Sequence, residues 1–266
     1  MTPQEELRQV AGVSLQVLRA GQGPQLLVLH DYEAAGHWYP YQSALAERFT
    51  VLAPSHPGFG TSERPEQIEI MEDVVYVYLD LLEELSGSFN LLGLGLGGWI
   101  AAEIAVRCSH NLHRLVLADS VGIKVSGPTE ADILDTFIMM DRDELLAATW
   151  HDPDLGAQRL TLPGEPDLPY ETLVAHIRGR ESALRYGWKP FMHNPKLRQW
   201  LHRISVPTLV LWGDDDRVVS PAYGRAFQQA IPGSRFQLID SAGHFPYLEQ
   251  PEQFVAAVTN FLSEER

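Results

Sequence analysis

Gly93-Leu94-Gly95-Leu96-Gly97-Gly98 joins two segments of different character. The apolar segment Phe89–Leu92 before it has the length and composition of a buried strand. The segment Trp99–Arg107 after it is long and rich in alanine and isoleucine, as helices are. Glycines fill four of the six linking positions and allow a sharp turn with close backbone packing. The stretch therefore predicts a strand, a tight turn and a helix in succession.

Two functional motifs fit this turn. The strand–turn–helix motif G-x-S-x-G presents a nucleophilic serine, and here Gly93 and Gly97 match while Gly95 takes the place of the serine. The dinucleotide-binding motif G-x-G-x-x-G also fits, with Gly98 as its last glycine and Asp119 as the acid about 20 residues further on. We favour the first motif, because the second belongs to a first βαβ unit and this run lies after several predicted elements.

Composition excludes several classes of function. The chain has 266 residues and is 45% hydrophobic, so it can bury the core of one large domain. Its formal net charge of −15 argues against nucleic acid or an anionic membrane as a partner, because phosphate binding needs clustered Lys and Arg. The single cysteine, Cys108, excludes an internal disulfide and suits a reducing compartment. With no signal-peptide pattern and no apolar run of ~18 residues, we expect a cytoplasmic protein.

Apolar runs with the length of strands alternate with runs that have the period of helices. The strands are expected near Val13–Leu18, Gln25–Leu29, Thr50–Ala53, Phe89–Leu92, Leu112–Ala118, Thr208–Leu211 and Arg235–Ile239. The helices are expected near Trp38–Arg48, Met71–Leu85, Trp99–Arg107, Ala222–Ala230 and Pro251–Leu262. Strands that are apolar on both faces and separated by helices predict an α/β fold, with a mostly parallel sheet covered on both sides.

The alternation stops between Val121 and about Arg203. Only helical patterns follow one another there, at Thr129–Met140, Asp143–Trp150, Tyr170–Tyr186 and Lys196–His202, with a proline-rich link at Leu162–Pro169. We therefore predict a core made of residues 1–120 and 204–266, with residues 121–203 inserted as a helical cap over one end of the sheet.

Four further turns complete the pattern. They are Leu29-His30-Asp31-Tyr32, Pro57-Gly58-Phe59-Gly60-Thr61-Ser62, Trp212-Gly213-Asp214-Asp215-Asp216-Arg217 and Gly243-His244-Phe245-Pro246. The glycine turn, an acid and a histidine follow in the chain order of the α/β-hydrolase triad. Over nearly its full length the chain resembles an α/β-hydrolase-fold protein with a helical cap. It is similar to capped esterases, lactonases, C–C bond hydrolases and haloperoxidase-like members of that superfamily.

The resemblance and the chemistry of the residues give the turns their roles. His244 is the expected catalytic base, and Asp216 is expected to hold one nitrogen of its ring protonated. The spacing within the family favours Asp216 over its neighbours Asp214 and Asp215, and Asp119 is a second candidate acid. Each of these residues also has a purely structural interpretation, as a turn or capping residue.

Two positions depart from the hydrolase pattern. Gly95 lacks a nucleophile, and Asp31 replaces a glycine in the first loop, where a backbone N–H near Tyr32 would help to stabilise an oxyanion. The other donor, the N–H of Leu96, would survive. Two departures together favour natural divergence over an engineered change.

A base without its usual partner has several possible uses. The gap left by Gly95 has room for a water that His244 activates. Asp31 is either a proton donor with a raised pKa in an apolar pocket or a capping aspartate of the loop. The expected substrate-binding residues, which could equally be internal packing, are His30, Trp38, Met139, Trp150, Trp188 and Phe245. The ten histidines show no ligand spacing, and we predict no metal and no other cofactor.

Three functions stay open at this stage. The first is an enzyme of the α/β-hydrolase superfamily that acts on a small apolar or aromatic carbonyl or ester-type substrate through His244 and Asp216. Activated-water hydrolysis, C–C cleavage and a lyase-type step are its possible reactions. The second is a catalytically silent protein that binds a small molecule in the same pocket, and the third is an NAD(P)-binding protein. The expected partner is a small molecule, and a homodimer stays open.

Overall fold

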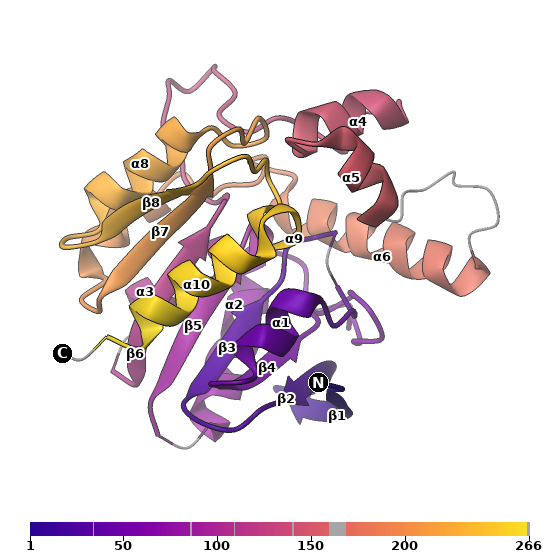
Figure 1. Ribbon diagram of the computed structural model, residues 1–266. Coiled ribbons are helices and arrows are strands. Elements are labelled where there is room, and N and C mark those ends of the chain that lie inside the picture. Colours follow the sequence, from indigo (N-terminus) through magenta and orange to yellow (C-terminus); the bar gives the residue numbers. More distant parts are fainter. Residues whose placement is uncertain (34, 86, 109, 140, 160–168, 265–266) are drawn as a thin grey trace.

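An eight-stranded sheet forms the centre of the computed structural model, which describes all residues except 34, 86, 109, 140, 160–168 and 265–266 (Figure 1). Its strand order is β1-β2-β4-β3-β5-β6-β7-β8, with β1 and β2 antiparallel to their neighbours and the remaining pairs parallel. The strands are β1 Gln4–Val10, β2 Val13–Ala20, β3 Gln25–Leu29, β4 Thr50–Pro54, β5 Phe89–Leu94, β6 Leu112–Ala118, β7 Thr208–Gly213 and β8 Arg235–Ile239. The mostly parallel sheet predicted from the sequence is confirmed.

Helices cover both faces of this sheet and bury one apolar cluster on each side. One cluster packs against α2 Met71–Glu84, α3 Leu96–Arg107 and α8 Pro221–Ala230. The other packs against α1 Pro40–Leu45, α9 Pro246–Glu249 and α10 Pro251–Leu262. Because both faces are buried, the inner strands are apolar at almost every position, as parallel sheets require.

The segment between β6 and β7 supplies further helices and no strand among its described residues. They are α4 Arg142–Thr149, α5 Pro153–Arg159, α6 Tyr170–Gly187 and α7 Leu197–Trp200, followed by the 3₁₀ turn η1 Leu201–Arg203. In Figure 1, α4, α5 and α6 lie together beyond one end of the sheet.

One predicted helix is absent from the part of the chain that the structure describes, and two elements of the structure were not predicted. The predicted helix Thr129–Met140 is absent from its described residues, because the Asp132 carboxylate accepts bonds from the backbone of Val125 and Ser126 and fixes a turn there. The sequence analysis missed β1, an edge strand of mostly polar residues, and it missed the short helix α5. Most of the proline-rich link Leu162–Pro169 lies outside the described residues.

The carboxyl ends of the parallel strands meet at one edge of the sheet. Asp31 lies just beyond β3, Gly95 beyond β5, Asp119 beyond β6 and Asp216 beyond β7. His244 follows β8 by five residues. This edge is where open α/β sheets bind their ligands. Among the described helices, none is both long and apolar enough to span a bilayer.

Candidate active site

The glycine turn is built by close packing. Gly95 begins α3 with φ +49° and ψ −112°, a left-handed conformation that a side chain rarely adopts. A Cβ at Gly97 would overlap the carbonyl groups of β3 and of His30, and one at Gly98 would overlap Ser120. These contacts account for the glycines without a dinucleotide. The carboxylate of Asp119, the proposed ribose ligand, is buried and accepts a bond from the N–H of Gly213 at 2.8 Å.

The space beside Gly95 is filled by the side chain of Asp31. A Cβ on Gly95 would lie 2.6 Å from Asp31 Oδ2 and closer still to Oδ1 and Cγ. The N–H of Leu96 donates to Asp31 Oδ1 at 2.9 Å, so the carboxylate also caps the first turn of α3. The expectation of a free gap for water at position 95 was therefore wrong, because a carboxylate from the neighbouring strand end occupies it. The N–H of Leu96 is likewise taken up by Asp31.

His244 lies between two carboxylates. Its Nδ1 is 2.9 Å from Asp216 Oδ2, and its Nε2 is 3.4 Å from Asp31 Oδ2. The other oxygen of Asp216 accepts from the backbone N–H groups of Val218 and Val219 at 2.8 and 3.0 Å. Among the described residues, no group makes a hydrogen bond of normal geometry to the buried Asp31 Oδ2, so this oxygen keeps an unused acceptor position beside His244.

Burial and charge act against each other on the histidine. Burial alone would lower the pKa of His244, but the charges and hydrogen bonds of Asp216 and Asp31 outweigh it and raise the pKa well above its ordinary value. The two carboxylates therefore favour the charged form of the ring, which has a proton on both nitrogens. Burial, followed by the charge of Asp216, raises the pKa of Asp119 well above the usual range of a carboxyl, which favours the neutral acid beside this ion row.

The loop that carries His244 is held by the helical insert. The N–H of His244 donates to the carbonyl of Thr149, the last residue of α4, at 2.8 Å. The N–H of Gly243 donates to Glu249 of α9 at 2.7 Å. Sequence reasoning missed both partners, since neither carries a motif.

A small cavity of about 20 Å³ opens beside the row. Its lining among the described residues is Asp31, Tyr32, Leu96, Val121, Ile133, Leu134, Thr136, Phe137, Phe191, Met192, Val218 and His244. Its polar groups are the side chains of Asp31 and His244 and the hydroxyls of Tyr32 and Thr136, and the other side chains are apolar. The volume suits about one water molecule, so a substrate needs the insert to shift or must enter with only a small part of its structure.

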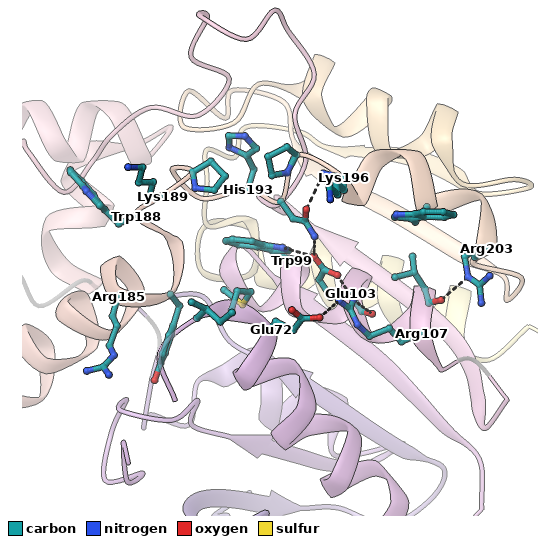
Figure 2. Close-up of a pocket in the computed structure, with 18 residues that line it drawn as sticks. Glu72, Trp99, Glu103, Arg107, Arg185, Trp188, Lys189, His193, Lys196 and Arg203 are labelled. Carbon is teal, nitrogen blue, oxygen red and sulfur yellow. Dashed lines mark hydrogen bonds and ion pairs between the residues drawn. The ribbon is translucent and has the colours of Figure 1, made fainter. Parts of the chain in front are cut away.

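None of the six predicted substrate-binding residues is among the described residues that line this cavity. The His30 ring stacks on His56, and its Nε2 accepts a hydrogen bond from the backbone N–H of His56. Burial lowers the pKa of His30 to about 4, so the ring is an uncharged part of the packing. The ring of Phe245 packs against the ring of Trp150, and its centroid lies 5.2 Å from that of the His244 ring. Trp38 bonds Ser43, Met139 packs against the second apolar cluster, and Trp188 is 57% exposed at a separate groove (Figure 2). Apolar side chains alone do not reveal which wall they will line.

The first loop carries one more buried acid that the sequence analysis did not single out. Glu33 bonds Arg180 of α6 at 2.8 Å and lies 3.4 Å from His176 on the same helix. Burial raises the pKa of Glu33 to about 7 against the opposing charge of Arg180. Among the described residues, no group of three His, Cys, Asp or Glu side chains is arranged to hold a metal ion.

Comparison with known proteins assigns the fold. The model of a family described as the alpha/beta hydrolase family matches residues 26–257. A pimeloyl-[acyl-carrier protein] methyl ester esterase of Nitrosomonas europaea is 27% identical, over 91% of this chain and 97% of its own. A 2-hydroxy-6-oxo-6-(2'-aminophenyl)hexa-2,4-dienoic acid hydrolase of Metapseudomonas resinovorans is 26% identical, over 97% and 91%. The solved structure of a serine hydrolase involved in carbazole degradation superposes with a TM-score of 0.76 at 23% identity, over 98% of this chain and 99% of its own.

Proposed function

This chain belongs to the alpha/beta hydrolase family, and within that family we propose that it is an enzyme that moves protons on a small apolar or aromatic carbonyl compound. It forms no acyl-enzyme at position 95. One observation carries the proposal: the carboxylate of Asp31 fills the place of a nucleophile and lies against the imidazole that Asp216 holds.

Acyl transfer is disfavoured at two steps. Gly95 cannot attack a carbonyl, and the N–H of Leu96 is bonded to Asp31 instead of being free for an oxyanion. Loss of one such donor lowers kcat by about 10²–10³-fold in a serine hydrolase. A carboxylate in the same place would also repel the negative charge of a tetrahedral intermediate.

Proton transfer uses the groups that the site does contain. Asp31 Oδ2 removes a proton from the carbon next to the carbonyl group, and the imidazolium of His244 gives its Nε2 proton to the carbonyl oxygen. The product is the enol, with Asp31 neutral and His244 uncharged, and reversal of both transfers restores the enzyme. Asp216 keeps the Nδ1 proton in place and stabilises the charged ring. Asp31 thus has the role of base, whereas the sequence analysis left a proton donor and a capping aspartate as its two interpretations.

The cavity wall favours an uncharged substrate. Apart from Asp31 and His244, the lining is formed by apolar side chains with the hydroxyls of Tyr32 and Thr136, which bond each other at 2.7 Å. The relatives named above act on a methyl ester and on a hexadienoic acid with keto and enol groups, which supports a carbonyl compound as the substrate. Tautomerisation and lyase-type cleavage beside a carbonyl both need a base and a proton donor, so both fit this site.

Deuterium exchange tests the proposal directly. We expect the protein to catalyse exchange of the C–H protons next to the carbonyl group of small aromatic ketones, such as phenylacetone and 2-indanone. The exchange is measured by NMR in D₂O. Asp31→Asn and His244→Gln should each lower the rate by about 10²-fold or more, the range of general acid–base catalysis. The rate should also fall as pH rises through the raised pKa of His244, because the imidazolium is lost.

The control is Asp215→Asn, which removes the half-buried carboxylate next to Asp216, paired with Arg217 and His151, and should leave exchange unchanged. Equal exchange by the protein and its Asp31→Asn variant would refute the base role. A burst of p-nitrophenol from p-nitrophenyl acetate would refute the absence of an acyl-enzyme.

A silent binding protein is the second candidate, favoured by the cavity of only about 20 Å³ and by the capping bond of Asp31 to α3. In that case ketones would bind without exchange, and Asp31→Asn would change stability rather than a rate.

A further inference from the structure

A second, much larger hollow lies outside the catalytic row. It has a volume of about 1120 Å³ and runs between α2 and α3 of the core and residues 185–203 of the insert (Figure 2). Sites for small organic molecules have volumes of about 300–1,000 Å³. The groove therefore has room for a whole ligand, whereas the catalytic cavity does not.

Positive charge gathers in this groove. The chain has only three lysines, and two of them, Lys189 and Lys196, line it. The third, Lys124, is bonded to Asp132. Within the described part of the chain, no hydrogen bond or ion pair engages the ammonium group of Lys189 or Lys196. The two acids of the groove are already engaged, since Glu72 and Glu103 both pair with Arg107.

Exposed indole rings accompany the two lysines. Trp188 is 57% exposed and Trp200 is 48% exposed, and both line the groove. Trp99 of α3 lies in its floor, where its Nε1 donates to Glu103. Large aromatic rings left open to solvent beside a hollow are typical of ligand-binding surfaces.

A single layer of residues separates the groove from the catalytic cavity. Along one short segment, Pro190 and His193 line the groove, while Phe191 and Met192 between them line the cavity. A Cβ on Gly187 would lie 2.7 Å from Met192 Sδ and 3.5 Å from the Trp99 ring. Trp99, in the floor of the groove, is therefore close to Met192, which lines the cavity. A ligand in the groove would rest against the wall of the active site.

We propose that this groove binds a small aromatic carboxylate. Lys189 and Lys196 lie apart along the groove, on either side of His193 (Figure 2). One of the two ammonium groups therefore holds the carboxylate, and the aromatic body lies against an exposed indole ring of the groove. An anion is the fitting occupant, because the structure describes no acid paired with either ammonium group, although the chain has a net charge of −15. The carboxylate belongs either to one end of a substrate that reaches across the partition or to a separate effector.

A matched pair of probes tests the site. Naphthalene-2-carboxylate and its neutral analogue naphthalene-2-carboxamide are titrated into the full-length protein, with tryptophan fluorescence and calorimetry as readouts. We expect the carboxylate to bind at least tenfold more tightly than the amide. The double variant Lys189→Gln/Lys196→Gln should lose that preference while it still binds the amide.

The control variant Arg48→Gln/Arg225→Gln removes the same charge from exposed positions outside the groove and should keep the preference. Equal affinity for the two probes, or an unchanged preference in the lysine double variant, would overturn the proposal. Binding should be unaltered in His244→Gln, so a failure of the proposed catalysis would not be mistaken for a failure of this site. In the ketone exchange assay, competitive inhibition by the carboxylate identifies a substrate end, and noncompetitive inhibition identifies an effector.

Discussion

Gly95 and Asp31 depend on each other sterically. The sequence shows two separate departures from the hydrolase pattern, but the structure shows one feature, since the carboxylate occupies the volume that a side chain at position 95 would need. Sequence reasoning placed Asp31 near the site, because it follows a strand whose end is at the catalytic edge. The direction of its side chain could not be predicted, since that direction depends on the path of an irregular loop and on the exposed N–H of α3.

We predict that Gly95→Ser alone does not restore a serine hydrolase. The new side chain overlaps Asp31 and should destabilise the fold by about 1–3 kcal/mol, as overpacking of a core does. In the Asp31→Gly background the same serine has space, and the N–H of Leu96 becomes free. The double variant should then unfold at a higher temperature than Gly95→Ser and should hydrolyse p-nitrophenyl acetate.

Asp31→Asn supplies the control for this cycle, because asparagine keeps the volume of the carboxylate and should keep the clash with Ser. Thermal unfolding of the four variants gives the coupling energy between the two positions. Additive effects of Gly95→Ser and Asp31→Gly would contradict the steric argument.

At the scale of elements, α6 is fastened to two loops of the core. The hydroxyl of Ser182 donates to the carbonyl of Gly58, and that of Tyr186 donates to the carbonyl of Pro57. A Cβ on Gly58 would overlap Ser182, which explains this glycine of the Pro-Gly-Phe-Gly turn. The second fastening is the buried pair of Glu33 and Arg180.

The predicted strands and long helices match the structure closely because their apolar residues recur with the period of the element. The ends of β3, β6 and β8 agree with the sequence analysis residue for residue. The failures are segments without such a period. β1 is held by pairing with β2, and residues 129–139 are held by the hydrogen bonds of Asp132. An apolar pattern predicts neither kind of interaction.

We predict that Glu33 makes the attachment of α6 depend on pH. The pKa of Glu33 is about 7 in the folded protein, against 4.5 for the free group. Below pH 4.5 both states are protonated, so there is no penalty. Between 4.5 and about 7 the unfolded state ionises first, and the free energy of unfolding falls by about 3 kcal/mol. Glu33→Gln should flatten this slope in urea titrations across that range, whereas Glu171→Gln, an exposed acid of the same helix, should preserve it. An unchanged slope in Glu33→Gln would show that the carboxyl is ionised in both states.

At the scale of the molecule, the insert shares both apolar clusters with the sheet. Ile133, Ala183 and Met192 belong to the cluster on one face, and Leu145 and Trp150 belong to the cluster on the other. The N–H of His244 donates to the carbonyl of Thr149 in α4, and the N–H of Leu134 donates to the carbonyl of Val218, close to Asp216. The insert is therefore separate from the core in chain order but packs into the same apolar clusters.

We predict that insert and core unfold together. Trp150 lies in the insert and Trp212 in β7, and both are fully buried, so each reports the packing of its own region. The chain has six tryptophans, so two variants are needed that keep either Trp150 or Trp212 and carry phenylalanine at the other five positions. They should give the same urea midpoint by fluorescence, and the far-UV circular dichroism should follow the same curve. A fluorescence change of Trp150 at lower urea than that of Trp212 would instead show a cap that detaches first. Such a detached cap would release the carbonyl of Thr149 from His244, so the catalytic row would lose its geometry before the sheet melts.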